Sequence, residues 1–138
     1  MRFTMKTINI NDSIGGITLN VHFQEKFCYL DNASGTGKSF LFRLLRRYYK
    51  EQDLVVIHVN YETETSTEST LMDYCKHADV VLLDNADLYL TRHIIQKFRE
   101  LDIQVIICMK NIRQVYSSDF VLYDVIYEGN TLSVKRCG

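Results

Sequence analysis

Apolar residues follow an alternating pattern at the start of the chain and form short continuous runs in its middle. Residues 17–23 alternate apolar and polar positions, and with residues 4–10 and the turn at 11–16 they predict an N-terminal β-hairpin. The continuous runs are typical of strands covered on both faces. They lie at residues 26–30, 54–59, 80–83 and 103–108.

Two segments carry the spacing of an amphipathic helix. From Lys38 onward, Leu41, Leu44, Leu45 and Tyr48 lie on one helical face, and residues 88–101 repeat this pattern. Residues 62–70 are polar and low in complexity, so we expect a mobile surface loop there.

The C-terminal part again predicts strands. Residues 120–127 and 131–135 flank Gly129 and Asn130, a dipeptide suited to a tight turn, and they predict a second hairpin. Buried strands that alternate with helices favour an α/β fold. We therefore expect a mainly parallel sheet flanked by helices, with N-terminal and C-terminal β-hairpins.

Length and composition fit one domain over residues 1–138. With 138 residues, 46% of them hydrophobic, the chain can build one good core but hardly two. Neither a signal peptide nor a membrane span is expected, which predicts a cytoplasmic protein. The formal net charge of -1 favours no partner by itself. The spacing of the four cysteines predicts free thiols rather than bridges or a metal site.

A glycine-rich segment between the apolar strand at residues 26–30 and the first helix carries the main chemical signal. Glycines let the backbone wrap closely around phosphate, and the following helix N-terminus offers free N–H groups to it. Measured against the pattern G-x-x-x-x-G-K-[ST], Asn32 stands where the first glycine is expected. The residues predicted to bind a nucleotide are Asn32, Ser34, Gly35, Thr36, Gly37, Lys38, Ser39 and Phe40. The alternative is an ordinary helix start capped by Thr36 or Ser34.

Asp84 ends the apolar run at residues 80–83. A carboxylate placed after a buried strand can hold Mg²⁺ beside a phosphate loop, so Ser39 and Asp84 are the predicted metal ligands. In isolation, a turn at Asp84 and Asn85 would explain the same residues.

Residues 34–39 and 80–84 resemble the Walker A and Walker B motifs of P-loop NTPases, and the chain is similar to a minimal ABC-type or AAA-type ATPase core. It lacks the ABC signature sequence and the helical subdomain that carries it. The resemblance implies ATP and Mg²⁺ as ligands. Its implied catalytic positions are Lys38, Asn85, Asp87 and Asn111.

Asn85 stands where related ATPases have a water-orienting glutamate. An amide can position water but cannot take its proton. Asp87 is a substitute acid, for which a helix cap is the favoured alternative. Asn111 resembles a polar sensor, with an ordinary loop end as the equal alternative. Glu62, Glu64 and Glu68 are more remote acids.

These residues predict an ATP-Mg²⁺-binding protein that is a weak or partner-dependent ATPase. The alternative is a nucleotide-binding interaction or regulatory module with little hydrolysis. A small-molecule kinase is disfavoured, because the polar segment at 62–70 is acidic and would repel phosphate. A protein partner or a homo-oligomer would supply missing groups. Arg92 is a candidate arginine finger, but nothing in the sequence ranks it above an ordinary surface residue.

A basic face completes the sequence signals. Arg43, Arg46, Arg47 and Lys50 recur at i, i+3, i+4 and i+7, opposite the apolar face of the first helix. An ordinary solvated face is the favoured interpretation. The alternative is a docking surface for an acidic protein or a nucleic acid backbone.

Overall fold

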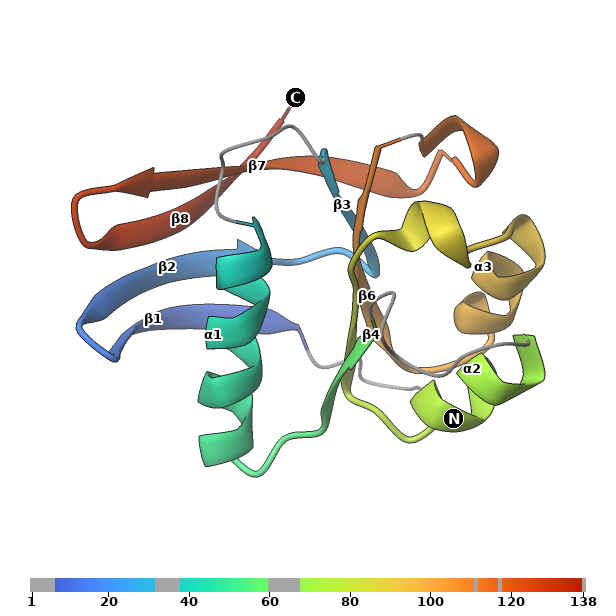
Figure 1. The fold of residues 1–138 in the computed structure, drawn as a ribbon, viewed down its shortest axis with the longest axis horizontal. Coiled ribbons are helices and arrows are strands. Elements are labelled where there is room, and N and C mark those ends of the chain that lie inside the picture. The colour runs from blue at the N-terminus through green and yellow to red at the C-terminus, as the bar shows by residue number, and fades with distance from the viewer. Residues whose placement is uncertain (1–6, 32–37, 60–67, 111, 117, 138) are drawn as a thin grey trace.

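The computed structural model describes residues 7–31, 38–59, 68–110, 112–116 and 118–137. Its main feature is one eight-stranded mixed sheet that curls strongly into half a barrel (Figure 1). The strand order is β1-β2-β8-β7-β3-β6-β5-β4. The strands are β1 (Ile8–Ile14), β2 (Ile17–Phe23), β3 (Phe27–Asp31), β4 (Val56–Val59), β5 (Val80–Leu83), β6 (Gln104–Met109), β7 (Phe120–Glu128) and β8 (Thr131–Arg136). The helices are α1 (Lys38–Glu51), α2 (Glu68–Cys75) and α3 (Arg92–Arg99), with short 3₁₀ turns η1 (Ala86–Leu88) and η2 (Ile112–Gln114).

The expected fold, a mainly parallel sheet flanked by helices, is wrong. Both predicted hairpins form, as the antiparallel pairs β1–β2 and β7–β8. They are not appendages, because β7 pairs in parallel with β3 and β2 pairs in parallel with β8, so both hairpins belong to the main sheet. Strand twist then accumulates over eight strands and curls the sheet. Helices make up only 28% of the structure, so the sheet dominates the architecture.

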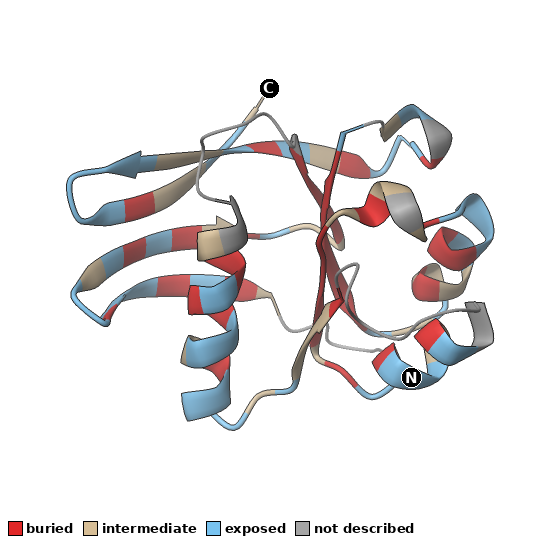
Figure 2. Ribbon diagram, in the orientation of Figure 1, coloured by how far each residue is buried: buried red, intermediate tan, exposed pale blue. Residues whose placement is uncertain are grey.

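The helices divide between the two faces of the sheet. Helix α1 packs inside the curl, and its core includes residues from both hairpins and from the central strands (Figure 1). Helices α2 and α3 cover the opposite face over β3, β5 and β6. Strands β5 and β6 are buried along their whole length, whereas β1 and β2 expose several positions between buried ones (Figure 2). The two kinds of apolar pattern therefore correspond to half-covered and fully covered strands.

The first hairpin is shifted relative to the sequence prediction. Strand β1 runs from Ile8 to Ile14 rather than over residues 4–10; residues 1–6 lie outside the described part. The turn is confined to Gly15 and Gly16, at φ 59° and 80°. Two glycines in the left-handed region make a tight turn, which lets the strand pair up to Ile14.

One predicted loop and one predicted helix also need correction. Residues 68–70 belong to α2 rather than to a loop, and this helix buries Leu71 and Cys75. Helix α3 begins at Arg92 rather than near residue 88, because the Thr91 hydroxyl accepts a 3.2 Å hydrogen bond from the Ile94 N–H. This side chain caps the helix.

Gln104 joins the N-terminal hairpin to the central sheet. Its side chain is fully buried at the start of β6. Its amide nitrogen donates to the Phe23 and Glu25 carbonyls at 2.7 and 3.0 Å, and its amide oxygen accepts from the Ile8 N–H at 2.9 Å. These bonds satisfy three backbone groups where β2 separates from the central strands.

Cys28, Cys75, Cys108 and Cys137 form no disulfide with one another in the described part of the chain. Cys28, Cys75 and Cys108 are buried, and burial raises the pKa of Cys28 and Cys75 to about 12. These two thiols stay protonated at neutral pH and are poor nucleophiles.

Candidate functional site

The candidate site lies at the carboxyl edge of the parallel strands. Strand β6 lies between β3 and β5, and β4 follows β5, all in parallel. Asp31 pairs with Met109, and Leu83 pairs with Ile107 and with Val59. These strands therefore end together, and ligands of open parallel sheets bind outside such ends.

The phosphate-loop prediction falls largely outside the described residues. Asn32, Ser34, Gly35, Thr36 and Gly37 are not described, nor is Asn111. Lys38 and Ser39 open α1 directly after that segment, although their side chains also lie outside the description. The described backbone therefore has the predicted strand, β3, before this segment and the predicted helix, α1, after it.

Asp84 directly follows β5 and is largely buried, with 12% of its side chain exposed. Its backbone N–H donates to the Val59 carbonyl at 2.8 Å, which fixes the end of β5 to the end of β4. A buried carboxylate needs a positive or hydrogen-bonding neighbour. Its Oδ2 lies 3.8 Å from the Nε2 of His58 on β4.

His58 is the residue that sequence reasoning missed. It was counted within an apolar strand, yet its imidazole lies beside Asp84 with only 7% of the side chain exposed. Neither ring nitrogen has a hydrogen-bond partner among the described residues, and the 3.8 Å separation is too long for a hydrogen bond. The ring packs edge-on against Phe42 of α1, with the two ring centroids 5.6 Å apart. Asp84 lies 26 positions later, so only the pairing of β4 with β5 reveals this proximity.

Tyr89 contacts the backbone at the ends of β4 and β5, next to Asp84. Its hydroxyl lies 2.7 Å from the Asp84 carbonyl oxygen and 3.1 Å from the Val59 carbonyl oxygen, and its single proton is donated to the nearer oxygen or shared between the two. Burial, reinforced by the charge of Asp84, raises the pKa of Tyr89. The phenol therefore remains a hydrogen-bond donor throughout the neutral range.

Asn85 and Asp87 shape the turn after β5. Asn85 has a left-handed backbone, φ 52°, before η1. The Asp87 carboxylate accepts from the Lys110 N–H at 2.9 Å, which ties this turn to the end of β6. The favoured alternative for Asp87, a cap of the following helix, is not observed, because Thr91 caps α3.

Phe40 lies in the first turn of α1. Its half-buried ring stacks on Tyr127 of β7 with centroids 5.8 Å apart and planes at 11°. The guanidinium of Arg43 lies 5.7 Å from the centre of the Phe40 ring. Phe40 is thus part of an aromatic contact between α1 and the C-terminal hairpin.

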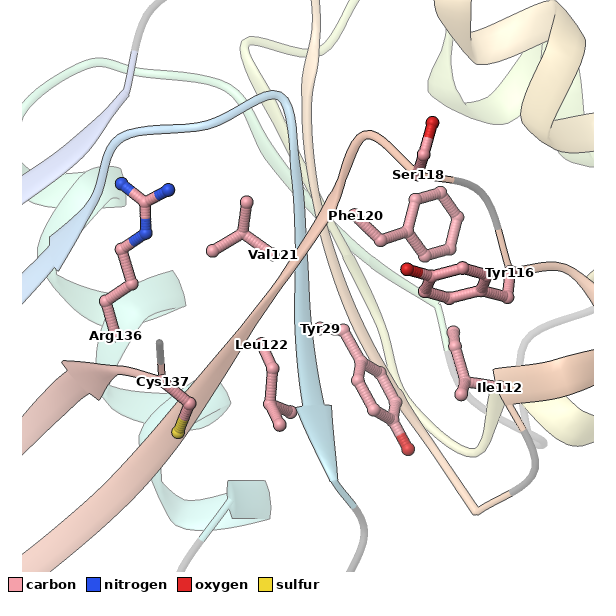
Figure 3. Close-up of a pocket in the computed structure, with 9 residues that line it drawn as sticks. All are labelled: Tyr29, Ile112, Tyr116, Ser118, Phe120, Val121, Leu122, Arg136 and Cys137. Atoms are coloured by element: carbon pink, nitrogen blue, oxygen red, sulfur yellow. The ribbon is translucent and has the colours of Figure 1, made fainter.

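A separate cavity lies mainly against the sheet face opposite α1 (Figure 3). It encloses about 460 Å³ and is lined by Tyr29, Ile112, Tyr116, Ser118, Phe120, Val121, Leu122, Arg136 and Cys137. The only cation of this lining, Arg136, contacts Glu25 at 2.9 Å. An aromatic wall and a neutralised arginine suit an apolar ligand better than a triphosphate.

Metal and membrane features are sparse. No three His, Cys, Asp or Glu side chains gather into a metal-binding group in the described part of the chain. The predicted Mg²⁺ ligands, one hydroxyl and one carboxylate, would not form such a group.

Across the described ranges, no helix has the length and apolar character needed to cross a bilayer.

Comparison with known proteins yields no relative. No family model matches the sequence, no curated protein matches it, and no solved structure matches the fold. The function must therefore be inferred from the residues at the carboxyl edge.

Proposed function

We propose that the protein binds ATP and Mg²⁺ at the carboxyl edge of β3, β6 and β5. The observation that carries this proposal is the meeting of two motifs at one edge. The strand before the glycine segment and the strand before Asp84 are separated only by β6 and run parallel to it. The resemblance of both motifs to Walker A and Walker B is the second support.

Each chemical role falls to a residue of this chain. The free N–H groups at the start of α1 and the Lys38 ammonium would bind the phosphates. Ser39 and Asp84 would hold Mg²⁺, which supplies positive charge to the phosphate oxygens. His58 and Tyr89 would keep Asp84 in position, as neighbours of metal ligands commonly do.

Hydrolysis in this proposal is slow or dependent on a partner. Asn85 cannot accept a proton from water, and one oxygen of Asp87 is engaged by the Lys110 N–H. A protein partner or a second copy would then supply a general base or an arginine such as Arg92. The second candidate function, a nucleotide-binding module with little turnover, is favoured by the same two observations.

Nucleotide binding can be tested by thermal unfolding with ATP and Mg²⁺, together with isothermal titration calorimetry. At about 100 times the dissociation constant, the ligand should stabilise the protein by about 2.7 kcal/mol. Lys38→Ala should remove this shift, and Lys76→Ala on α2 is the matched control. An unchanged melting temperature with millimolar ATP-Mg²⁺, and no heat of binding, would refute the proposal.

Phosphate release then separates the two candidate functions. A rate of phosphate release per protein molecule that increases with protein concentration, and that disappears in Lys38→Ala, indicates a self-association-dependent ATPase. Binding without release at every protein concentration favours the interaction module.

A further inference from the structure

The outward face of α1 gathers four cations. Arg43, Arg46, Arg47 and Lys50 are all exposed, and together they line one surface hollow of about 300 Å³. We call this hollow the basic groove. The first and last of these cations are seven positions apart, or about 10 Å along the helix axis. That length matches two or three successive phosphates of a nucleic acid strand.

Within the described part of the protein, most of the charge of the basic groove is not neutralised by acidic side chains. Arg47 lies 4.0 Å from Glu51, and both side chains are 60% exposed; the other three have no acidic partner among the described residues. By contrast, Arg99, which lies outside the groove, forms an ion pair with Asp119 at 2.9 Å. Like charges at i and i+4 on a helix repel one another by a few tenths of a kcal/mol, about 0.2–0.5 kcal/mol per pair. The fold therefore gains little from the groove, whereas a polyanion would relieve its repulsion.

An aromatic surface borders the groove. Arg43 lines the groove and also lies over the Phe40 ring, which stacks on Tyr127. Tyr127 remains 43% exposed. Cations followed by an exposed ring are the two components by which proteins bind single strands, since phosphates meet the cations and an unpaired base stacks on the ring.

One cation of the groove, Arg47, lies close to the first hairpin. A side-chain carbon placed on Gly15 would lie 3.1 Å from a terminal nitrogen of Arg47. Arg47 therefore reaches across from α1 to the β1–β2 turn, and glycine there leaves room for its guanidinium. This contact orients one cation of the groove.

We propose that the basic groove and Tyr127 bind single-stranded nucleic acid. The strand's phosphates would lie along α1, and one base would stack on Tyr127. A duplex keeps its bases stacked inside and leaves Tyr127 unused, and an acidic protein segment carries no planar base for it. This interaction is separate from the ATP site and does not rest on it.

Fluorescence anisotropy with labelled 20-nucleotide oligothymidylate and oligouridylate tests the proposal. Three phosphate contacts predict a slope of about -2 for the logarithm of affinity against the logarithm of salt concentration. The variant Arg46→Gln, Arg47→Gln, Lys50→Gln should bind at least 20-fold more weakly. The control variant Lys76→Gln, Lys97→Gln, Arg113→Gln, which removes the same number of cations outside the groove, should change affinity less than twofold.

Stacking is tested by Tyr127→Ala and Tyr127→Phe. The first should weaken binding about fivefold because a base loses its platform, and the second should retain it; Tyr74→Ala on α2 is the control. Melting temperatures verify that every variant is folded. Absence of oligonucleotide binding at low salt, equal losses in both triple variants, or preference for a duplex or an acidic peptide would overturn the proposal.

Discussion

Gln104 and His58 are both polar side chains buried among parallel strands, but Gln104 begins its strand whereas His58 lies near the carboxyl end of its own. Gln104, at the amino end of β6, forms three hydrogen bonds to backbone groups. His58, near the carboxyl end of β4, forms none with the described residues. A buried polar side chain whose hydrogen bonds are all formed helps to specify a fold. A buried polar side chain without hydrogen bonds costs free energy of folding. The comparison indicates that the fold explains Gln104 but not His58.

Gln104→Leu should have the largest effect of the variants considered. It leaves the Ile8 N–H and the Phe23 and Glu25 carbonyls without their partner. The free energy of unfolding should fall by about 3 kcal/mol, with about 1 kcal/mol for each lost bond. Urea denaturation measures the change, and Gln52→Leu, at an exposed position after α1, should change it by less than about 0.5 kcal/mol. If Gln104→Leu lowers the free energy of unfolding no more than this control does, the Gln104 hydrogen bonds do not stabilise the fold.

Asp84→Asn probes the carboxyl end. If Asp84 holds Mg²⁺, the amide should reduce Mg²⁺-dependent ATP affinity at least tenfold, which corresponds to about 1.4 kcal/mol. The measurement is the melting temperature with ATP plus Mg²⁺ and with ATP plus a chelator. Asp73→Asn on α2 should preserve the difference between these conditions. If Asp84→Asn preserves it too, Asp84 is not a metal ligand.

Tyr89→Phe should have a smaller effect on stability. The hydroxyl that bridges Val59 and Asp84 is lost while the ring remains. We expect the free energy of unfolding to fall by about 1 kcal/mol, as determined by urea denaturation, whereas Tyr74→Phe at an exposed position on α2 should be neutral. If Tyr89→Phe also leaves the free energy of unfolding unchanged, this hydroxyl does not stabilise the ends of β4 and β5.

His58→Phe should have the smallest effect on stability and is the sharpest test of the comparison. The phenyl ring can keep the edge contact with Phe42 and removes two unsatisfied nitrogens. Without nucleotide, the free energy of unfolding should stay within about 1 kcal/mol of the original or rise. Mg²⁺-dependent ATP affinity should still fall severalfold, because Asp84 loses its neighbour. His77→Phe, on the surface after α2, is the control for both readouts. A strong loss of stability with unchanged affinity would make His58 structural, like Gln104.

The sequence predicted local elements better than their assembly. Both hairpins and the continuous apolar strands were predicted, because burial on one face or on both leaves a direct periodic signal. Helix α2 was missed because residues 68–70 have no core-facing pattern. The helix exists because it buries Leu71 and Cys75 against the sheet, which is a tertiary effect.

The curl of the sheet and the position of His58 were not predictable in this way. The curl depends on the pairing of β2 with β8, whose residues are more than 100 positions apart. His58 approaches Asp84 only because β4 and β5 are neighbours. Periodicity carries no information about such long-range pairings, whereas a motif such as residues 34–39 is local and therefore visible.

The parallel pairing of β2 with β8 also has a consequence for how the protein folds. The first hairpin meets the rest of the sheet through β8, the last strand of the chain, at one edge. Loop closure over such a distance is slow, and contacts of high sequence separation delay folding. During synthesis, residues 8–23 must wait for residues 131–136 before their strand edge is covered. The unpaired edge of β2 is thus the segment of a nascent chain that is most in need of protection from aggregation.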